Sequence, residues 1–258
     1  MKPFIALGSP ADTVLTLQAG YRPLGAVVGV SAVAIGSSLN QSGMNGAELR
    51  ARTDAVTTAL GNARRRAEEQ AVALGASGVV GVRVELLKNA SAPEGLVEVR
   101  CVGTAVVEKT PLPKPFLSNL NGPDLLKLVS TGYRPVGLAV GFCFYTQTAG
   151  YRADNARKKA TPPTMRNGVT LRPYEHPDFT DATYHARGIA MERLRSDARA
   201  VGAEGVVGVE LSPNVHLGGA ELGCEFIAVG TAVSRDRWSQ VKISEPAIVV
   251  SVGDLEKL

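Results

Sequence analysis

A long internal repeat is the feature that most constrains how this chain folds. The segment GASGVVGVRV at 75–84 returns as GAEGVVGVEL at 202–211, which lies 127 residues later. The segment GYRPLGAVVG at 20–29 returns as GYRPVGLAVG at 132–141, which lies only 112 residues later. The sequence therefore predicts two copies of one structural unit, the second enlarged by about 15 residues between these two matches.

The repeat sets the expected domain boundaries. We expect a first unit over 1–110 and a second over 116–236, separated by a linker at 111–115 whose alternating prolines exclude a helix or a central strand. The extra residues of the second unit fall in a polar, basic insert at about 146–178. The residues after the second unit, 237–258, form a C-terminal tail.

Each copy carries the same order of predicted elements. A short helix begins after a capping residue, Ser9 or Asn121, and ends at a glycine. A strand, a long helix with a small-residue stripe and two further strands follow. The expected ranges are 24–36, 47–74, 79–87 and 96–107 in the first copy, and 136–145, 180–201, 206–212 and 221–233 in the second.

The predicted fold class is therefore α+β. We expect two tandem two-layer units, each a three-stranded, mainly antiparallel sheet with one long helix and a short N-terminal helix. Hydrophobic residues make up 45% of the chain and charged residues 20%, which is typical of a soluble globular protein. Both faces of the strands are largely apolar, so something besides the single long helix must cover them.

Four glycines lie at matching places in the two copies. A dinucleotide-binding fingerprint has its glycines between a strand and the helix that follows, whereas these lie after a helix and inside a strand. Glycine within a strand marks a bulge or the close approach of another backbone. We therefore expect close contacts or subunit interfaces at Gly78, Gly81, Gly205 and Gly208.

The pattern of helix, G-A-x-x-V-V-G-V strand and G-T-A-V strand resembles the YbjQ-type family, described as "putative heavy-metal-binding" proteins. The resemblance spans about 20–107 and 132–234. It implies a dodecin-like fold and assembly into a pentamer-like ring, with no established reaction. The open edges and apolar second faces of the sheets independently favour a homo-oligomer.

A divalent metal ion is the one cofactor to consider. The best cluster of ligand types lies in the second copy, where Asp181 and His185 stand four residues apart on a predicted helix. The first copy contains no histidine, and a polar loop followed by an acidic helix start is the alternative interpretation. The candidate metal ligands are His176, Asp178, Asp181 and His185.

Two further features suggest partners. The insert carries a basic patch that would suit an acidic protein, although its lack of interleaved aromatic residues argues against nucleic acid. The tail contains IVVSV, which could add to a sheet edge, and its end VGDLEKL resembles encapsulin-targeting tails, so a protein partner could bind there. The patch consists of Arg152, Arg157, Lys158, Lys159, Arg166 and Arg172.

The remaining sequence features exclude several classes of function but do not assign one. The sequence has no membrane-length apolar run, no secretory leader and no paired cysteine spacing, so we expect a cytoplasmic protein. Cys101 and Cys224 lie on apolar strands and are expected to be core residues. No nucleophile motif or phosphate loop is present, which favours a non-enzymatic protein.

Three functions remain open from sequence alone. The first is a ring-forming scaffold or binding protein of the YbjQ-like family. The second is a heavy-metal or small-ligand binding protein with sites at the interfaces between units. The third is a basic adaptor for nucleic acid or an acidic protein partner.

Overall fold

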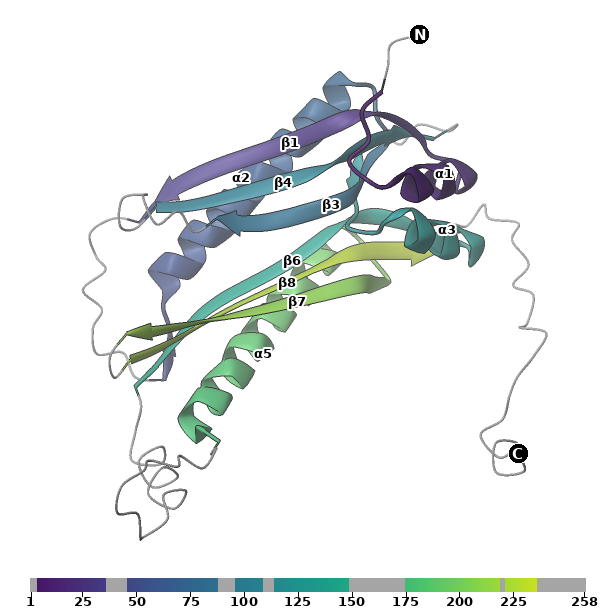
Figure 1. The fold of residues 1–258 in the computed structure, drawn as a ribbon. Coiled ribbons are helices and arrows are strands. Elements are labelled where there is room, and N and C mark those ends of the chain that lie inside the picture. Colours follow the sequence, from purple (N-terminus) through teal and green to yellow (C-terminus); the bar gives the residue numbers. More distant parts are fainter. Residues whose placement is uncertain are drawn as a thin grey trace, which may run out of the picture.

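Two sheets, each accompanied by one long helix, make up the molecule (Figure 1). The computed structural model describes residues 4–35, 46–87, 96–108, 114–148, 175–218 and 221–235. The two halves of the chain repeat one order of elements, so the predicted α+β class with two tandem two-layer units is confirmed.

The first repeat forms an antiparallel sheet in the order β1-β4-β3, in which β4 lies between its two neighbours. The β4 strand pairs with β1 along its whole length and with β3 across a bulge between Val80 and Arg83. The elements are α1 (Pro10–Gln18), β1 (Arg22–Ala34), α2 (Arg50–Ala73), β3 (Gly78–Leu87) and β4 (Leu96–Val107).

The second repeat has the same arrangement, in the order β6-β8-β7. Its β7 carries the matching bulge between Val207 and Glu210. Next to the expected insert, β6 continues to Thr148 and the long helix begins at Pro177. The elements are α3 (Gly122–Ser130), β6 (Tyr133–Thr148), α5 (Pro177–Ala200), β7 (Gly205–Gly218) and β8 (Glu221–Arg235).

Each sheet has a fourth strand, which the sequence did not predict. The two-residue β2 (Ala47–Glu48) of the first repeat pairs antiparallel with β6 of the second. In return, β5 (Phe116–Leu117) of the second repeat pairs parallel with β3 of the first. The expected three-stranded sheets are thus four-stranded, because each repeat gives a short segment to the other.

The helix termini follow the sequence signals. Ser9 caps α1 and Asn121 caps α3, and each side chain accepts a hydrogen bond from the backbone N–H three residues later. Gly75 follows α2 with φ of 70° and Gly202 follows α5 with φ of 72°, the left-handed conformation that glycine adopts without strain. These caps fix where the long helices end and the next strands begin.

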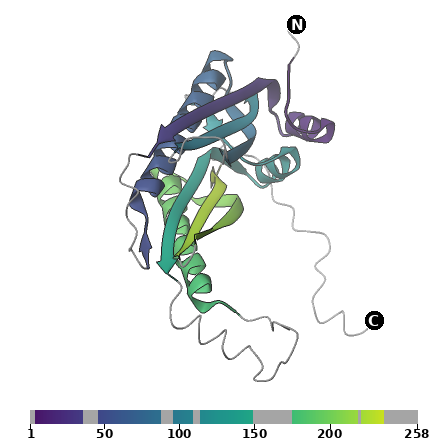
Figure 2. The same ribbon diagram turned by 60° about the vertical axis from the view of Figure 1, so that its left-hand side comes forward.

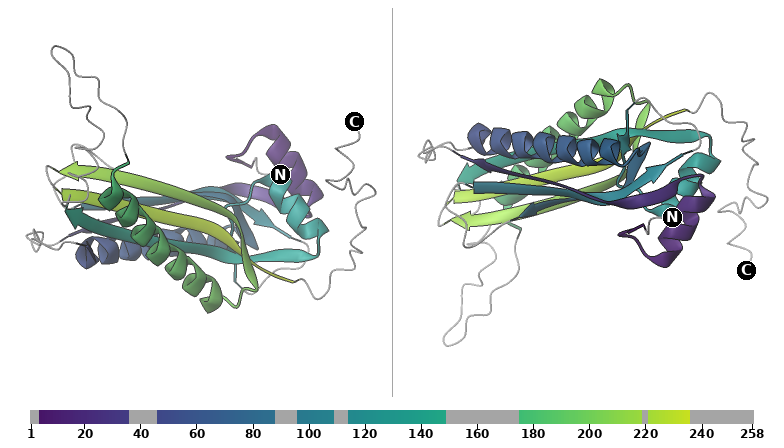
Figure 3. Two further views of the ribbon diagram at one scale, coloured as in Figure 1. Left: turned by 90° about the horizontal axis from the view of Figure 1, so that it is seen from below. Right: turned by 90° about the horizontal axis from the view of Figure 1, so that it is seen from above.

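The long helices lie close to their own sheets (Figure 3) because small residues line the contact. A Cβ atom on Gly29 would come within 1.9 Å of the carbonyl oxygen of Ala63, and one on Gly141 within 1.9 Å of that of Ala190. The buried stripe on α2 is Ala55, Ala59, Ala63, Ala67 and Ala71, and that on α5 is Ala182, Ala186, Ala190, Leu194 and Ala198. The small-residue stripe that the sequence predicts on each long helix is thus its buried face.

The short helices α1 and α3 lie side by side in both views of the fold (Figures 1 and 2). The start of α3 approaches α1 so closely that a Cβ on Gly122 would meet the carbonyl oxygen of Asp12 at 2.2 Å. This contact joins the two repeats beyond their exchanged strands.

Candidate functional site at the junction of the two repeats

We use the word junction for the surfaces through which the two repeats contact each other. Its backbone is formed by residues 116–120, which lie beside β3 of the first repeat. Ser118 donates its N–H to Val79 O at 2.9 Å and accepts from Val82 N at 2.9 Å. Gly81 donates to Leu120 O at 2.9 Å. The segment is therefore held as an added strand, a common way for one chain segment to bind a sheet edge.

The contacts and φ angles at the junction explain why the repeated valine-rich motif contains glycines. A Cβ on Gly78 would lie 2.4 Å from the ring of Phe116, so glycine leaves the space that this ring fills. Gly81 has φ of 61° and Gly208 has φ of 59°, at the bulges of β3 and β7. Among the described residues, a Cβ on Gly205, which corresponds to Gly78, would meet only the side chain of Val233, at 3.8 Å. Gly208 is also closely approached, since a Cβ there would lie 2.6 Å from Cδ2 of Leu120, whereas the described residues leave the space over Gly205 open.

An apolar contact runs along the junction. Val82 of β3 and both Val140 and Phe142 of β6 are buried in one cluster, together with Val56 and Leu60 of α2. One helix and one strand of the first repeat therefore cover the face of β6 that α5 does not cover. Burial of side chains of this size contributes about 1.5–3 kcal/mol each.

Ion pairs border this apolar contact. Arg193 of α5 binds both carboxylate oxygens of Glu48, at 2.5 and 3.1 Å, and donates to Phe142 O at 2.8 Å. Burial raises the pKa of Glu48, but hydrogen bonds from Arg193 and Thr53 outweigh it, so the pKa lies below its ordinary value. Arg64 of α2 binds Asp197 of α5 at 2.7 Å. Both pairs join the first repeat to the second.

A buried threonine holds the exchanged segment at its own sheet. The Thr231 hydroxyl lies 2.9 Å from Ser118 Oγ, accepts from Asn119 N at 3.1 Å and donates to Asn119 Oδ1 at 2.6 Å. Thr104, its counterpart in the repeated GTAV motif, accepts from Leu7 N at 3.0 Å. The sequence repeats this threonine, but nothing in the sequence shows that its hydroxyl anchors the segment before each short helix.

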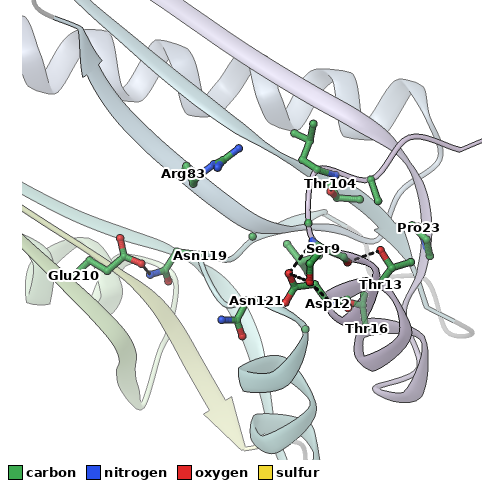
Figure 4. Close-up of a pocket in the computed structure, with 16 residues that line it drawn as sticks. Ser9, Asp12, Thr13, Thr16, Pro23, Arg83, Thr104, Asn119, Asn121 and Glu210 are labelled. Carbon is green, nitrogen blue, oxygen red and sulfur yellow. Dashed lines mark hydrogen bonds between the residues drawn. The ribbon is translucent and has the colours of Figure 1, made fainter.

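A cavity of about 430 Å³ opens beside the junction (Figure 4). Ser9, Asp12 and Thr104 of the first repeat line one end, whereas Asn119 and Glu210 of the second line the other. Its walls offer hydroxyls, amides and carboxylates, and Arg83 adds a positive charge. Leu7, Pro23 and Val80 add apolar surface, so the walls suit a small ligand that has both polar and apolar groups.

The Asp12 carboxylate in this cavity belongs to a helix cap. It accepts hydrogen bonds from the hydroxyl and the N–H of Ser9, at 2.7 and 2.9 Å. These two bonds lower the pKa of Asp12. The carboxylate is thus held ionised by its own helix, which differs from the raised pKa of a catalytic general acid.

The predicted metal ligands do not come together as a site. His176 caps α5 and accepts from Phe179 N at 3.3 Å, Asp178 is buried beside it, and the His185 ring stacks on Tyr145 at 5.5 Å. Asp181 lies one turn before His185 on α5. Within the described ranges no three His, Cys, Asp or Glu residues gather as metal ligands would. A metal ion at these four residues therefore stays a prediction.

The cysteines are core residues, as expected. Burial raises the pKa of the Cys101 thiol to about 11 and, with the nearby Glu48 charge, that of Cys143 to about 12. Burial also raises the pKa of Cys224. A soft metal binds the thiolate form, so buried thiols whose pKa is raised do not favour a heavy-metal centre.

Two predicted partner surfaces lie outside the described residues. All six residues of the basic patch, from Arg152 to Arg172, fall within 149–174, and the tail falls within 236–258. Within the part of the chain that the structure describes, no helix is long and apolar enough to span a membrane.

Comparison with known proteins gives two matches. The YbjQ-type family model, described as "Putative heavy-metal-binding", matches residues 23–109 and 171–236. A curated relative, the encapsulin nanocompartment protein Rv1762c of Mycobacterium tuberculosis (strain H37Rv), is 35% identical over 226 residues. That alignment covers 84% of this chain and 80% of the relative.

Proposed function

Because this chain belongs to the YbjQ-type family, with one match in each repeat, we propose that it is a non-enzymatic, self-assembling scaffold protein. The observation that carries the proposal is the exchange of strands at the junction. A unit that gives and receives edge strands is built for association with another unit of its kind.

The two outer edges of the molecule support self-assembly. In the described residues β1 and β7 each pair on one side only. Both edges carry large apolar side chains that are exposed in a single chain, as does the segment before α1. They are Phe4, Ile5 and Leu7 before α1, Val28 and Val30 on β1, and Val209 and Leu211 on β7. Apolar groups concentrated along unpaired edges are typical of subunit contacts.

The relative gives the assembly a biological setting. It is named an encapsulin nanocompartment protein and is similar to this chain over most of both lengths. We extend that setting to this chain and propose a scaffold that serves such a compartment in the cytoplasm.

Mass photometry of the purified full-length chain tests the proposal. We expect a discrete assembly of several 27.0 kDa chains at nanomolar to micromolar concentration. Negative-stain electron microscopy should then show particles of uniform size. A single chain throughout this range would contradict the scaffold function.

A second candidate function is supported by the cavity beside the junction. Its volume of about 430 Å³ and its mixed walls, with hydroxyl, amide and charged groups beside apolar side chains, suit a small ligand with polar groups bound between the repeats. The family description points to metal, but the described residues do not fit such a site, so no role is assigned to an ion. A thermal-shift screen of small polar metabolites tests this function, with Thr104→Val as the variant that should lose a genuine hit.

A further inference from the structure

We propose that chains join head to tail by repeating, between two copies of this protein, the junction that the two repeats form within one copy. In this arrangement β7 of one chain binds residues 4–7 of the next, just as β3 binds residues 116–119. This inference rests on the proposed self-assembly and specifies the surfaces that carry it.

The first observation is that an aromatic ring fills the space over Gly78, whereas no described aromatic ring fills the equivalent space over Gly205. Phe4 corresponds to Phe116 and Gly205 to Gly78 in the two repeats. Phe116 is 2% exposed because it fills the space over Gly78, whereas Phe4 is 52% exposed and no described residue comes closer than 3.8 Å to a Cβ on Gly205. Phe4 of a second chain would fill that space as Phe116 fills its own.

The segment that would bind is already held in place. Leu7 N–H bonds the Thr104 hydroxyl at 3.0 Å, and the equivalent Asn119 N–H bonds Thr231 at 3.1 Å. Residues 4–7 and residues 116–119 are therefore anchored to equivalent threonines, each in the sheet of its own repeat. A preorganised segment loses less conformational entropy when it binds.

The apolar surfaces match in the same way. Val82 of β3 is 4% exposed and packs in one cluster with Val140 and Phe142 of β6. The equivalent Val209 of β7 is 37% exposed, and Val30 of β1, which corresponds to Phe142, is 36% exposed. The β7 edge thus carries the apolar side chain that corresponds to Val82 of β3. The β1 edge carries the one that corresponds to Phe142 of β6.

An ion pair adds specificity. Arg193, which binds Glu48 across the junction, corresponds to Arg66, and Glu48 corresponds to Glu175. Arg66 donates to Val30 O as Arg193 donates to Phe142 O, so the guanidinium is already in position. Arg66 and Glu175 have no ionic partner among the described residues. Glu175 of one chain would therefore bind Arg66 of the next.

The joined surfaces are different from each other, so the contact is head to tail. Each added chain leaves one surface of each kind free, and the series ends only when the last chain binds the first.

The same contact between chains assigns a role to the start of α5. His176 corresponds to Leu49, whose N–H donates to Phe144 O at 2.8 Å across the junction. Residues 175 and 176 would thus contact β1 of the next chain.

The variant Gly205→Val tests whether Phe4 of a second chain fills the space over Gly205. A Cβ there has only an ordinary contact within its own chain, but it would collide with Phe4 of a second chain. We expect mass photometry to show loss of the assembly, with an unchanged circular dichroism spectrum. Gly188→Ala is the control, because a Cβ at Gly188 meets nothing within 4 Å. Wild-type assembly that persists in Gly205→Val would overturn this joint but leave self-assembly intact, whereas a monomeric wild type would overturn both.

Exchanging the charges of Arg66 and Glu175 gives a second test, which does not depend on the space over Gly205. We expect Arg66→Glu to weaken association between chains by roughly tenfold or more, because it leaves two acidic groups face to face. Adding Glu175→Arg should recover most of that loss. Arg65→Glu is the control, since Arg65 binds Glu69 on its own helix. A double variant no tighter than Arg66→Glu alone would contradict the pairing.

Discussion

Gly141 lies so close to Ala190 that a Cβ atom on the glycine would come within 1.9 Å of the alanine carbonyl oxygen. The same relationship joins Gly29 to Ala63 in the other repeat. A β-strand and a helix approach this closely only where one lacks a side chain and the other has a short one. This contact sets the distance between each sheet and its long helix.

Gly141→Ala is therefore expected to destabilise the protein strongly. The methyl group has no space, and the helix must move away from β6, which should lower the free energy of unfolding by about 3 kcal/mol, the upper end of the usual cost of overpacking. Urea denaturation followed by circular dichroism measures the loss. Gly188→Ala, on the open side of α5, should be neutral or slightly stabilising. Equal stability of the two variants would contradict the close contact.

Phe116→Ala and Phe4→Ala should have opposite consequences, although the repeat places the two residues in equivalent positions. Removing the buried Phe116 ring should lower the free energy of unfolding by about 3–5 kcal/mol. Removing the exposed Phe4 ring should change it by less than about 0.5 kcal/mol, measured at a concentration where single chains dominate. Phe4→Ala should instead weaken assembly in mass photometry. A large loss of stability in dilute Phe4→Ala would show that Phe4 is buried within its own chain.

Acid should weaken the junction through Glu48. The pKa of this carboxyl in the folded protein lies below its ordinary value of 4.5, because its hydrogen bonds outweigh burial. Its contribution to stability is therefore complete above about pH 4.5 and is lost as the pH falls through the folded-state pKa. Thermal denaturation from pH 3 to 7 should show a smaller loss of stability in acid for Glu48→Gln than for the wild type. Parallel curves for the two proteins would count against the ion pair with Arg193.

The thiols should be unreactive in the folded protein. Raising the pKa of Cys101 from 9.0 to about 11 reduces its thiolate fraction near pH 8 about 100-fold, and Cys143 is affected more. Reaction with an aromatic disulfide reagent at pH 8 should therefore be at least about 100-fold slower than after unfolding in urea. Fast labelling of the native protein would show that a cysteine is open to solvent and available as a ligand.

Much of the fold was predictable because it depends on local patterns that the chain contains twice. The capped starts of α1 and α3, the glycines after α2 and α5 and the alanine stripes each identify an element from a few neighbouring residues. The bounds of β6 and α5 were less predictable, because the polar insert between them has no counterpart in the first repeat.

The candidate site was less predictable because it is made between the repeats. Histidine and acidic residues near 176–185 attracted a metal hypothesis, but their spacing could not show that His176 caps α5 or that His185 stacks on Tyr145. The residues that join the repeats, Arg193 and Glu48, lie far apart in the chain and look like ordinary surface charges in sequence.

The sequence by itself determined that this protein is a duplicated α+β unit of valine-rich strands and alanine-striped helices, because side-chain periodicity and end-capping residues act over short distances. Only the tertiary structure decided that the two units exchange edge strands, and that Gly78 is covered by Phe116 while Gly205 is open. The physical reason is that similar local sequences have different tertiary surroundings in the two repeats. Among the described residues, the inner edges of the two sheets meet within the molecule, whereas the outer strands β1 and β7 pair on one side only.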